Sequence, residues 1–342
     1  MTGVALGEKA APDPMTGERS NEPDRLISQI SQTSRRHTVQ DPTGLYRFET
    51  DCDPTHMRAS SLVVAMGAFI DAGHTGKLIS DHLLGALDHS VVASFDVDQM
   101  LDYRGRRPLM TFDRDRYTTY DDPAIVLYRV LDVDGTPFLL LTGPEPDYQW
   151  ERMTEAVRGL VRTFGVSLTV SVHGIPMGVP HTRPIGLTAH ASDGALIPDN
   201  NPVFGEVMVP ASFASLLELR LGESGYDTVG FSVHVPHYLA QTDFADAALT
   251  GLRAVSGATG LALPTAELAA VAGANREAID SEIGDNEEVV QVVRALEGQY
   301  DQWTRGLDKP TLLAPSIGEL PTADEIGAEF EQFLRTHSDG EA

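Results

Sequence analysis

A short turn rich in glycine and charge, Asp71-Ala-Gly-His-Thr-Gly-Lys77, carries residue types that could bind a phosphate. A P-loop needs glycine five residues before Gly76 and serine or threonine after Lys77, because its backbone and hydroxyl groups hold the phosphates and their metal ion. Asp71 and Leu78 occupy those positions, so the sequence excludes a P-loop. The free N–H groups of a following helix could still bind an anion. Asp71 would oppose that anion or cap the helix itself, and capping is the favoured interpretation.

Histidines form the second candidate group, because several lie at or near predicted strand ends or in loops. They are His74, His173, His181, His190, His234 and His237. A metal site would need three or four converging His, Asp or Glu ligands at fixed geometry. The sequence has no His-Glu-x-x-His motif and no close ligand pair, so we expect no metal and no cofactor. Hydrogen-bonded loop histidines are the favoured interpretation for most of the set.

The sequence gives little support to nucleophilic catalysis. It lacks the Gly-x-Ser-x-Gly motif that places a serine on a sharp turn between a strand and a helix. The lone cysteine, Cys52, could be a nucleophile, but a structural or incidental thiol is favoured. A single cysteine cannot form an internal disulfide, which fits a reducing cytoplasm.

A dense basic cluster is formed by Arg104, Arg106 and Arg107. Guanidinium groups bind carboxylates and phosphates through paired hydrogen bonds, so the cluster could hold an anion. It could equally pair with acidic residues of its own chain or of a neighbouring subunit. Pairing is the favoured interpretation.

The elements that must position these residues alternate between strands and helices. Apolar runs predict buried strands at 62–69, 90–96, 166–173, 184–190 and 229–236. Helices are predicted after Lys77, at 148–164 and at 243–256. Two β runs, 125–131 and 136–141, flank an Asp-Gly pair and predict a hairpin. The alternation predicts a three-layer α/β/α sandwich with a mixed sheet.

From about residue 265 the strand patterns end, and helices are predicted at 265–274, 276–283 and 287–306. Apolar residues spaced by four and three positions form a seam on the last helix. They are Val289, Val293, Leu296, Tyr300 and Trp303. Packing on the protein's own core is favoured over binding another chain.

Composition narrows the class of protein further. The chain has 342 residues, enough for a large core, and a formal net charge of −25. Such acidity argues against nucleic acid as a partner, because phosphate binding needs a basic face. Residues 266–342 alone carry 17 acidic and 5 basic side chains, which favours a solvated acidic surface. No apolar run approaches the ~20 residues that span a bilayer, so we expect no membrane partner. The N-terminus shows no apolar signal core, and we expect a cytoplasmic protein.

An ordered set of motifs resembles the proteasome assembly chaperone 2 family, most of all its actinobacterial branch of uncharacterised proteins. The motifs are Leu62–Leu87, Gly143–Asp147, Val172–Pro176, Val179–Pro184 and Val235–His237. The resemblance covers roughly residues 46–263 and the helical tail. It implies a fold similar to purine nucleoside phosphorylases and related hydrolases, with a three-layer α/β/α core and a mixed sheet.

The resemblance also implies self-assembly. The bacterial branch resembles trimers in which a β-hairpin insertion forms the contact, and the C-terminal helices would cover a pocket at the sheet edge like a lid. No catalytic residue can be carried over from the family. Archaeal and eukaryotic relatives that act on the proteasome end in a hydrophobic-Tyr-X tail. The sequence here ends in Ser338-Asp-Gly-Glu-Ala342, so we do not expect docking by such a tail.

We therefore divide the chain into four parts: a mobile tail at 1–45, an α/β core with a β-hairpin insertion at 46–264, an acidic helical lid or appendage at 265–336, and a tail at 337–342. The leading hypothesis is a self-assembling, non-enzymatic protein, with a homotrimer favoured, that binds an unknown protein or a small ligand.

The alternative is a hydrolase- or phosphorylase-like enzyme, or a ligand-binding protein, with a pocket at the carboxyl edge of the sheet under the helical lid. Candidate lining residues are Asp71, His74, Glu145, His173, His181 and Arg183. Arg104, Arg106 and Arg107 are candidates for an anion or subunit contact. The sequence assigns no catalytic role to any of them.

Overall fold

The computed structural model describes residues 39–50, 52–67, 70–198, 200, 205–284 and 287–305. By its internal contacts the chain divides into two units, Met1–Gln40 and Asp41–Ala342, and every element described below belongs to the second. Most of the predicted tail at 1–45, the appendage beyond residue 305 and the tail at 337–342 lie outside the described residues.

An eight-stranded mixed sheet forms the centre of this unit, in the order β1-β3-β6-β7-β2-β8-β10-β9. Four parallel neighbours make its middle: β7 (Pro137–Pro144), β2 (Ser61–Gly67), β8 (Leu168–Met177) and β10 (Asp227–Pro236). The outer strands run antiparallel to their neighbours: β6 (Val126–Leu131), β3 (His89–Phe95), β1 (Tyr46–Phe48) and β9 (Leu187–Ala191). Parallel strands are buried on both faces, which explains the continuous apolar runs.

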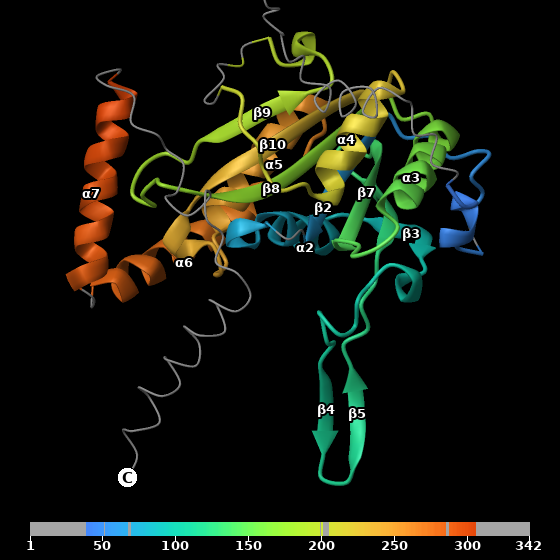
Figure 1. The fold of residues 1–342 in the computed structure, drawn as a ribbon, viewed down its shortest axis with the longest axis horizontal. Coiled ribbons are helices and arrows are strands. Elements are labelled where there is room, and N and C mark those ends of the chain that lie inside the picture. Colours follow the sequence, from blue (N-terminus) through green and yellow to red (C-terminus); the bar gives the residue numbers. More distant parts are fainter. Residues whose placement is uncertain are drawn as a thin grey trace, which may run out of the picture. The chain divides into compact units, whose positions relative to one another are not determined.

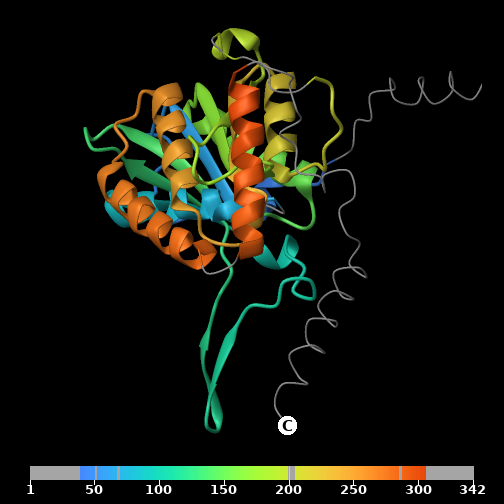
Figure 2. The same ribbon diagram turned by 90° about the vertical axis from the view of Figure 1, so that its left-hand side faces the viewer.

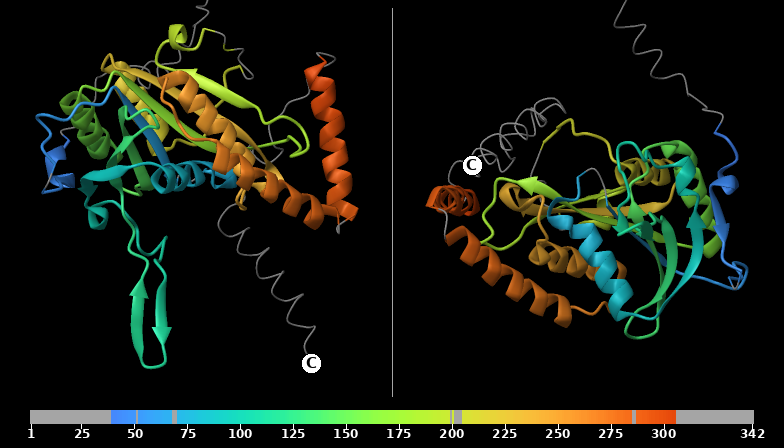
Figure 3. Two further views of the ribbon diagram at one scale, coloured as in Figure 1. Left: turned by 180° about the vertical axis from the view of Figure 1, so that it is seen from behind. Right: turned by 90° about the horizontal axis from the view of Figure 1, so that it is seen from below.

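Helices cover both faces of the sheet, which gives the predicted three-layer α/β sandwich with a mixed sheet (Figure 1, Figure 3). One face carries α2 (Thr75–Ala86) and α5 (Ala245–Thr259), and the other carries α3 (Trp150–Phe164) and α4 (Phe213–Glu223). α6 (Ala266–Gly284) packs on α5, and α7 (Glu287–Thr304) follows it. Short 3-10 turns lie at Pro42–Leu45, Ala72–His74, Val97–Gln99, Gly194–Leu196 and His237–Leu239.

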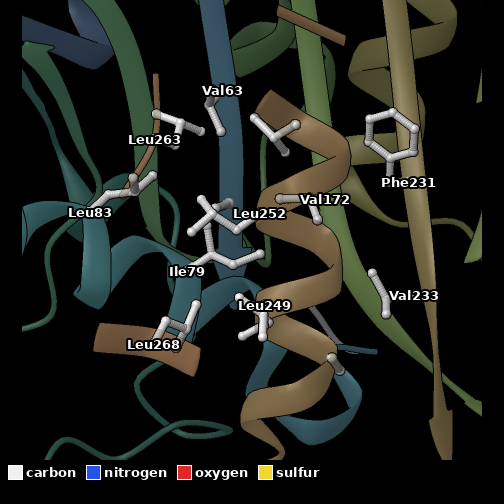
Figure 4. Packing of buried hydrophobic residues seen from close by; sticks show 14 of the residues in the cluster. Val63, Ile79, Leu83, Val172, Phe231, Val233, Leu249, Leu252, Leu263 and Leu268 are labelled. Carbon is white, nitrogen blue, oxygen red and sulfur yellow. The ribbon is translucent and has the colours of Figure 1, made fainter. Parts of the chain in front are cut away.

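A large apolar cluster fills the core between the sheet and the helices α2 and α5. Ile79 of α2 and Leu252 of α5 are completely buried, and both lie against Val63 and Val172 of the central strands (Figure 4). Fully burying one such side chain contributes roughly 1.5–3 kcal/mol. Packing in this core therefore holds the helices α2 and α5 against the central strands.

Of the two helices on the opposite face, α3 was predicted from the sequence and α4 was not. α3 buries the apolar residues that its periodicity predicted: Met153, Val157, Leu160, Val161 and Phe164. The short helix α4, whose buried residues Phe213, Leu217 and Leu221 are spaced by four, was not predicted. Its start is set by Ser212, whose hydroxyl accepts a hydrogen bond from the N–H of Ser215 (3.1 Å).

The prediction of two helices at 265–274 and 276–283 is wrong, because α6 continues through Asn275. The Asn275 side chain does not end the helix. It accepts a hydrogen bond from the N–H of Ala245 (3.2 Å) and donates one to the carbonyl of Asp243 (3.2 Å). The asparagine therefore joins α6 to the start of α5.

The predicted strand at 166–173 likewise continues, as β8, to Met177. Gly174, the residue after the predicted strand end, lies within β8, where an added Cβ would lie only 2.0 Å from the carbonyl oxygen of Ala72. The glycine permits a close approach between β8 and the turn before α2, rather than a change of chain direction.

The hairpin predicted around Asp132 is present as β6 and β7. A second hairpin, β4 (Met110–Asp113) with β5 (Arg116–Tyr120), lies within the charged section between β3 and β6. In Figures 1 and 2 it extends away from the sheet as an arm. Every residue of its two strands is exposed.

Candidate functional site

The Asp71 carboxylate occupies the start of α2, where an anion would otherwise bind. Its oxygens accept hydrogen bonds from the N–H groups of Gly76 (2.8 Å) and Lys77 (3.2 Å), and from Gly174 of β8 (3.2 Å). Burial raises the pKa of this carboxyl, and the three backbone bonds act against that rise. Of the two interpretations of this turn, the structure shows the capping one.

His74, which ends the same turn, faces a different neighbour. It adopts a left-handed conformation (φ 49°), and its Nδ1 lies 2.6 Å from Oδ1 of Asp243, just before α5. Both side chains are substantially exposed. The contact joins the loops that precede α2 and α5.

Glu145 lies buried at the end of β7, where its Oε1 accepts a hydrogen bond from the N–H of Phe213 (2.5 Å) at the start of α4. Arg106 donates to the carbonyl of Glu145 (2.9 Å) and pairs with Asp147 (2.9 Å). This corner therefore anchors the segment that leads into the β4–β5 hairpin. Arg106 follows the pairing interpretation of the arginine cluster.

Arg104 and Arg107 behave differently from Arg106. Within the described residues, neither guanidinium forms a hydrogen bond or an ion pair. Arg104 uses only its backbone N–H, which donates to Asp102 (2.9 Å). The N–H of Arg104 and, to a smaller extent, its positive charge lower the pKa of Asp102.

His181 and Arg183 join the loop after β8 to the C-terminal helices. The His181 ring is buried, with Nδ1 2.7 Å from the Tyr238 hydroxyl and Nε2 3.0 Å from Asp280 of α6. Arg183 binds Asp301 of α7. Burial raises the pKa of Tyr238 to about 12, so this hydroxyl stays protonated.

His173 takes part in a separate polar network on the face of the sheet that carries α4. Its Nε2 lies 3.3 Å from Oγ of Ser232 on the neighbouring strand β10. On the other side of that hydroxyl, at 3.4 Å, lies Nε2 of His190 from β9. The Nδ1 of His190 lies 2.8 Å from Oε1 of Glu218 on α4. Four side chains from four elements thus form one continuous chain of contacts.

The strand register explains how these residues meet. His173 pairs with Ser232 across β8 and β10, and His190 pairs with Gly230 across β10 and β9. Alternation along a strand then places all of these on one face. The His190 ring lies over Gly230, where an added Cβ would lie 1.9 Å from its Cε1.

Burial governs the protonation of this region. Burial, and secondarily the nearby His190, lowers the pKa of His173 to about 4. Burial alone lowers the pKa of His234 to about 4 as well, and its Nε2 lies 2.8 Å from the Thr188 hydroxyl. Both imidazoles are therefore neutral at pH 7.

A pocket of about 410 Å³ opens beside the network. His190 and Glu218 form part of its wall, and their side chains are 39% and 15% exposed. The other lining residues are Ala191, Ser192, Ser215, Leu219, Gly222 and Glu223. The deeper end of the network is less open, since Ser232 is only 9% exposed.

The six residues proposed for a single pocket thus have different partners: Asp71 caps α2, His74 meets Asp243, and Glu145 meets α4. His181 and Arg183 meet α6 and α7, and His173 meets Ser232. Ser232 and Glu218 were not among the predicted site residues. No local motif marks them, because strand pairing and the unpredicted α4 bring them together.

Across the described ranges, no three or more His, Cys, Asp or Glu residues are grouped so as to hold a metal ion. None of the described helices is long and apolar enough to cross a membrane.

Several proteins of known structure share this architecture. A Mycobacterium tuberculosis protein of unknown function is 47% identical, with a TM-score of 0.74 over 77% of this chain and 90% of that one. A Corynebacterium glutamicum protein of unknown function is 35% identical, with a TM-score of 0.71 over 77% and 99% of the two chains. A second M. tuberculosis protein, described as a proteasome-assembly chaperone homologue, is 22% identical with a TM-score of 0.62 over 68% and 99%, and shares the fold.

Among curated proteins, none matched this sequence. The sequence model of the PAC2 family matches residues 65–283, from the middle of β2 to the end of α6. The chain belongs to the PAC2 family.

Proposed function

We propose that this chain is a self-associating protein that binds a protein partner, and that the β4–β5 hairpin forms the contact between its copies. A homotrimer in the cytoplasm is the form we propose, with the two core-proximal helices α6 and α7 as an appendage. The observation that carries the proposal is the exposure of the hairpin.

The hairpin carries large apolar side chains that do not pack in the core and are exposed. Phe112 and Tyr117 are 58% and 67% exposed, and Leu109 at its base is 77% exposed. The rings of Phe112 and Tyr117 contact each other edge to face, with centroids 5.2 Å apart. An isolated two-stranded hairpin is at best marginally stable in water, and contiguous exposed apolar surface marks interaction sites. A second copy packed against the arm would supply the missing burial.

The base of the hairpin adds charge to the same surface. Arg104 and Arg107 have no ion-pair partner within the described part of their own chain, although the protein carries a net charge of −25. Such cations can pair with carboxylates of a second copy, against the overall repulsion between two chains that each carry a net charge of −25. The apolar exposure of the hairpin is therefore the main reason to place a second copy on this surface.

The description of one relative supports the proposal of a protein partner. One solved relative of the same fold is described as a proteasome-assembly chaperone homologue. We accordingly propose that this chain binds a partner protein while that partner is being assembled into a larger complex.

Self-association is tested by size-exclusion chromatography with light scattering on the full chain. We expect the wild type at the mass of three copies and Phe112→Asp at a lower mass, because a charge at the contact must be desolvated. Val133→Asp is the matched control, since Val133 is 65% exposed in the turn between β6 and β7. A monomeric wild type, or a Phe112→Asp variant that keeps the full mass, would overturn the proposal.

The partner is tested separately by co-purification of the tagged full chain from native lysate at moderate salt. We expect one stoichiometric protein to remain bound to the wild type. Recovery of the chain alone would refute a stable partner while leaving self-association standing.

A further inference from the structure

We propose that Ser232, His190 and Glu218 form a nucleophile–base–carboxylate triad that hydrolyses small uncharged carboxylic esters entering from the pocket beside α4. This activity lies beyond the protein-binding role and does not depend on it. The inference rests on the contacts, the space around them and the charge of the pocket.

The order of contacts is that of an activated serine. A nucleophile needs a base within hydrogen-bond reach, and the base needs a third group that orients it. His190 Nε2 lies 3.4 Å from Ser232 Oγ, and His190 Nδ1 lies 2.8 Å from Glu218 Oε1. The first distance is long for a hydrogen bond, as is common before substrate binds, while the second already fixes the ring.

One assignment of protons satisfies every contact in the network. His190 donates its Nδ1–H to Glu218, which leaves Nε2 free to accept the proton of Ser232. His173 then donates its Nε2–H to Oγ of Ser232 from the opposite side, at 3.3 Å. Because the pKa of His173 is about 4, this imidazole is neutral and does not place a second positive charge beside His190. His173 is therefore a positioning residue for the serine hydroxyl.

Two neighbouring residues, Gly230 and Ser171, accommodate His190 and Glu218. Gly230 lies in the middle of β10, where only the absence of a Cβ lets the His190 ring cross the strand. The hydroxyl of Ser171 lies 3.4 Å from the second carboxylate oxygen of Glu218. These polar side chains lie beside the apolar cluster that fills the rest of the space under α3 and α4. Buried polar networks stabilise a fold only when every member is satisfied, so their placement is restrictive.

The pocket selects the class of ester. The pocket has a volume of about 410 Å³, and its wall includes Glu218 and Glu223, of which Glu223 pairs with Arg220 (2.9 Å). The carboxylate of Glu218 repels an anionic substrate. Leu219 and Ala191 supply apolar surface for a short acyl or alkyl group. A short uncharged ester fits these properties better than a phosphorylated or free-acid compound.

The reaction balances without any cofactor. Oγ of Ser232 bonds to the ester carbonyl carbon while its proton passes to Nε2 of His190. The bond to the leaving oxygen then breaks, and that oxygen takes the proton and departs as an alcohol. Water, losing a proton to His190, attacks the acyl-serine. The bond between the acyl carbon and Oγ of Ser232 breaks, the proton held by His190 returns to Oγ, and the carboxylic acid leaves.

The test labels the full-length protein with a fluorophosphonate probe and maps the modified residue by mass spectrometry. We expect labelling at Ser232 in the wild type, no label in Ser232→Ala, and a roughly 10²–10⁴-fold lower labelling rate in His190→Gln. Ser94→Ala and His89→Gln, which lie on β3, are the matched controls and should label like the wild type.

The same proteins are assayed with p-nitrophenyl acetate, with circular dichroism as a check on folding. We expect kcat/KM to fall in Ser232→Ala and His190→Gln but not in the controls. A wild type that carries no label at Ser232, or hydrolysis that persists unchanged in Ser232→Ala, overturns the triad. Neither result bears on the hairpin, whose test measures mass.

Discussion

The guanidinium of Arg183 holds the carboxylate of Asp301 through two hydrogen bonds, Nε to Oδ1 at 2.9 Å and Nη2 to Oδ2 at 3.0 Å. Its third nitrogen donates to Oε1 of Glu297 at 3.1 Å. Arg183 lies in the loop between β8 and β9, whereas both carboxylates belong to α7. One side chain thus ties the last described helix to the sheet. The Arg183 bonds also lower the pKa of Asp301.

We expect Arg183→Lys to loosen α7 without unfolding the protein. A lysine keeps the positive charge but cannot form the paired geometry with Asp301. The apolar contacts of Tyr300 and Trp303 with the end of β8 remain, so the helix stays in place but opens more often. Hydrogen exchange measured by mass spectrometry should show faster exchange confined to α7. The matched variant Arg158→Lys, in α3, should leave α7 unchanged, and equal exchange in both variants would contradict the prediction.

Asp132 gives a prediction about pH and stability. Its buried carboxylate accepts hydrogen bonds from the N–H groups of Asp134 (3.0 Å), Thr136 (2.7 Å) and Ala262 (2.9 Å). Burial alone would raise the pKa, but these bonds outweigh it and lower the pKa below its usual value of 3.8. A lowered pKa in the folded state stabilises the protein above that value, and this contribution is lost as the pH falls through the folded pKa.

We therefore expect Asp132→Asn to cost about 1–3 kcal/mol at pH 7, because the amide N–H₂ would face a backbone donor. The cost should shrink as the pH falls below 3.8 and through the lowered folded-state pKa, where the wild-type carboxyl itself becomes protonated. Urea unfolding at pH 7 and over a series of acidic pH values measures the difference. Asp134→Asn, exposed in the same turn, is the control. A cost that stays constant with pH would show that the charge of Asp132 is not involved.

Local patterns were sufficient to predict much of the fold. Parallel strands that are buried on both faces require uninterrupted apolar runs, so β2 and β10 could be predicted from such runs alone. The Asp132 turn was readable because Asp-Gly fixes a tight turn between two β runs. In each case a few neighbouring residues determine the structure.

The candidate site was less predictable, because its contacts are set by strand order and not by sequence distance. Ser232 and His190 meet because β9 returns antiparallel beside β10, and Glu218 reaches them from a helix that was not predicted. The continuation of β8 through Gly174 was not predicted, for a related reason. The neighbour of Gly174, Ala72, lies on another element, so no local pattern distinguishes a turn glycine from a close-contact glycine.

The close contact at Gly174 should make this position intolerant of any side chain. The Cβ of Gly174→Ala would meet the backbone oxygen of Ala72 at 2.0 Å, and backbone cannot rotate away as a side-chain tip can. Separating the two elements would also weaken the bond from Gly174 N–H to Asp71. We expect a loss of about 1–3 kcal/mol or more in urea unfolding. Gly85→Ala in α2, where the added Cβ meets open space, should instead be neutral or stabilising by up to ~1 kcal/mol.

Gly230→Ala should separate the proposed chemistry from the fold. Its Cβ would overlap Cε1 of His190 at 1.9 Å, but that atom is the tip of a rotatable side chain on an edge strand. The ring should therefore swing out of line with Ser232 while the sheet remains intact. We expect little change in the urea midpoint and a loss of fluorophosphonate labelling at Ser232. Gly257→Ala in α5, which meets open space, should keep the labelling. Full labelling of Gly230→Ala would mean that the position of His190 does not govern the reactivity of Ser232.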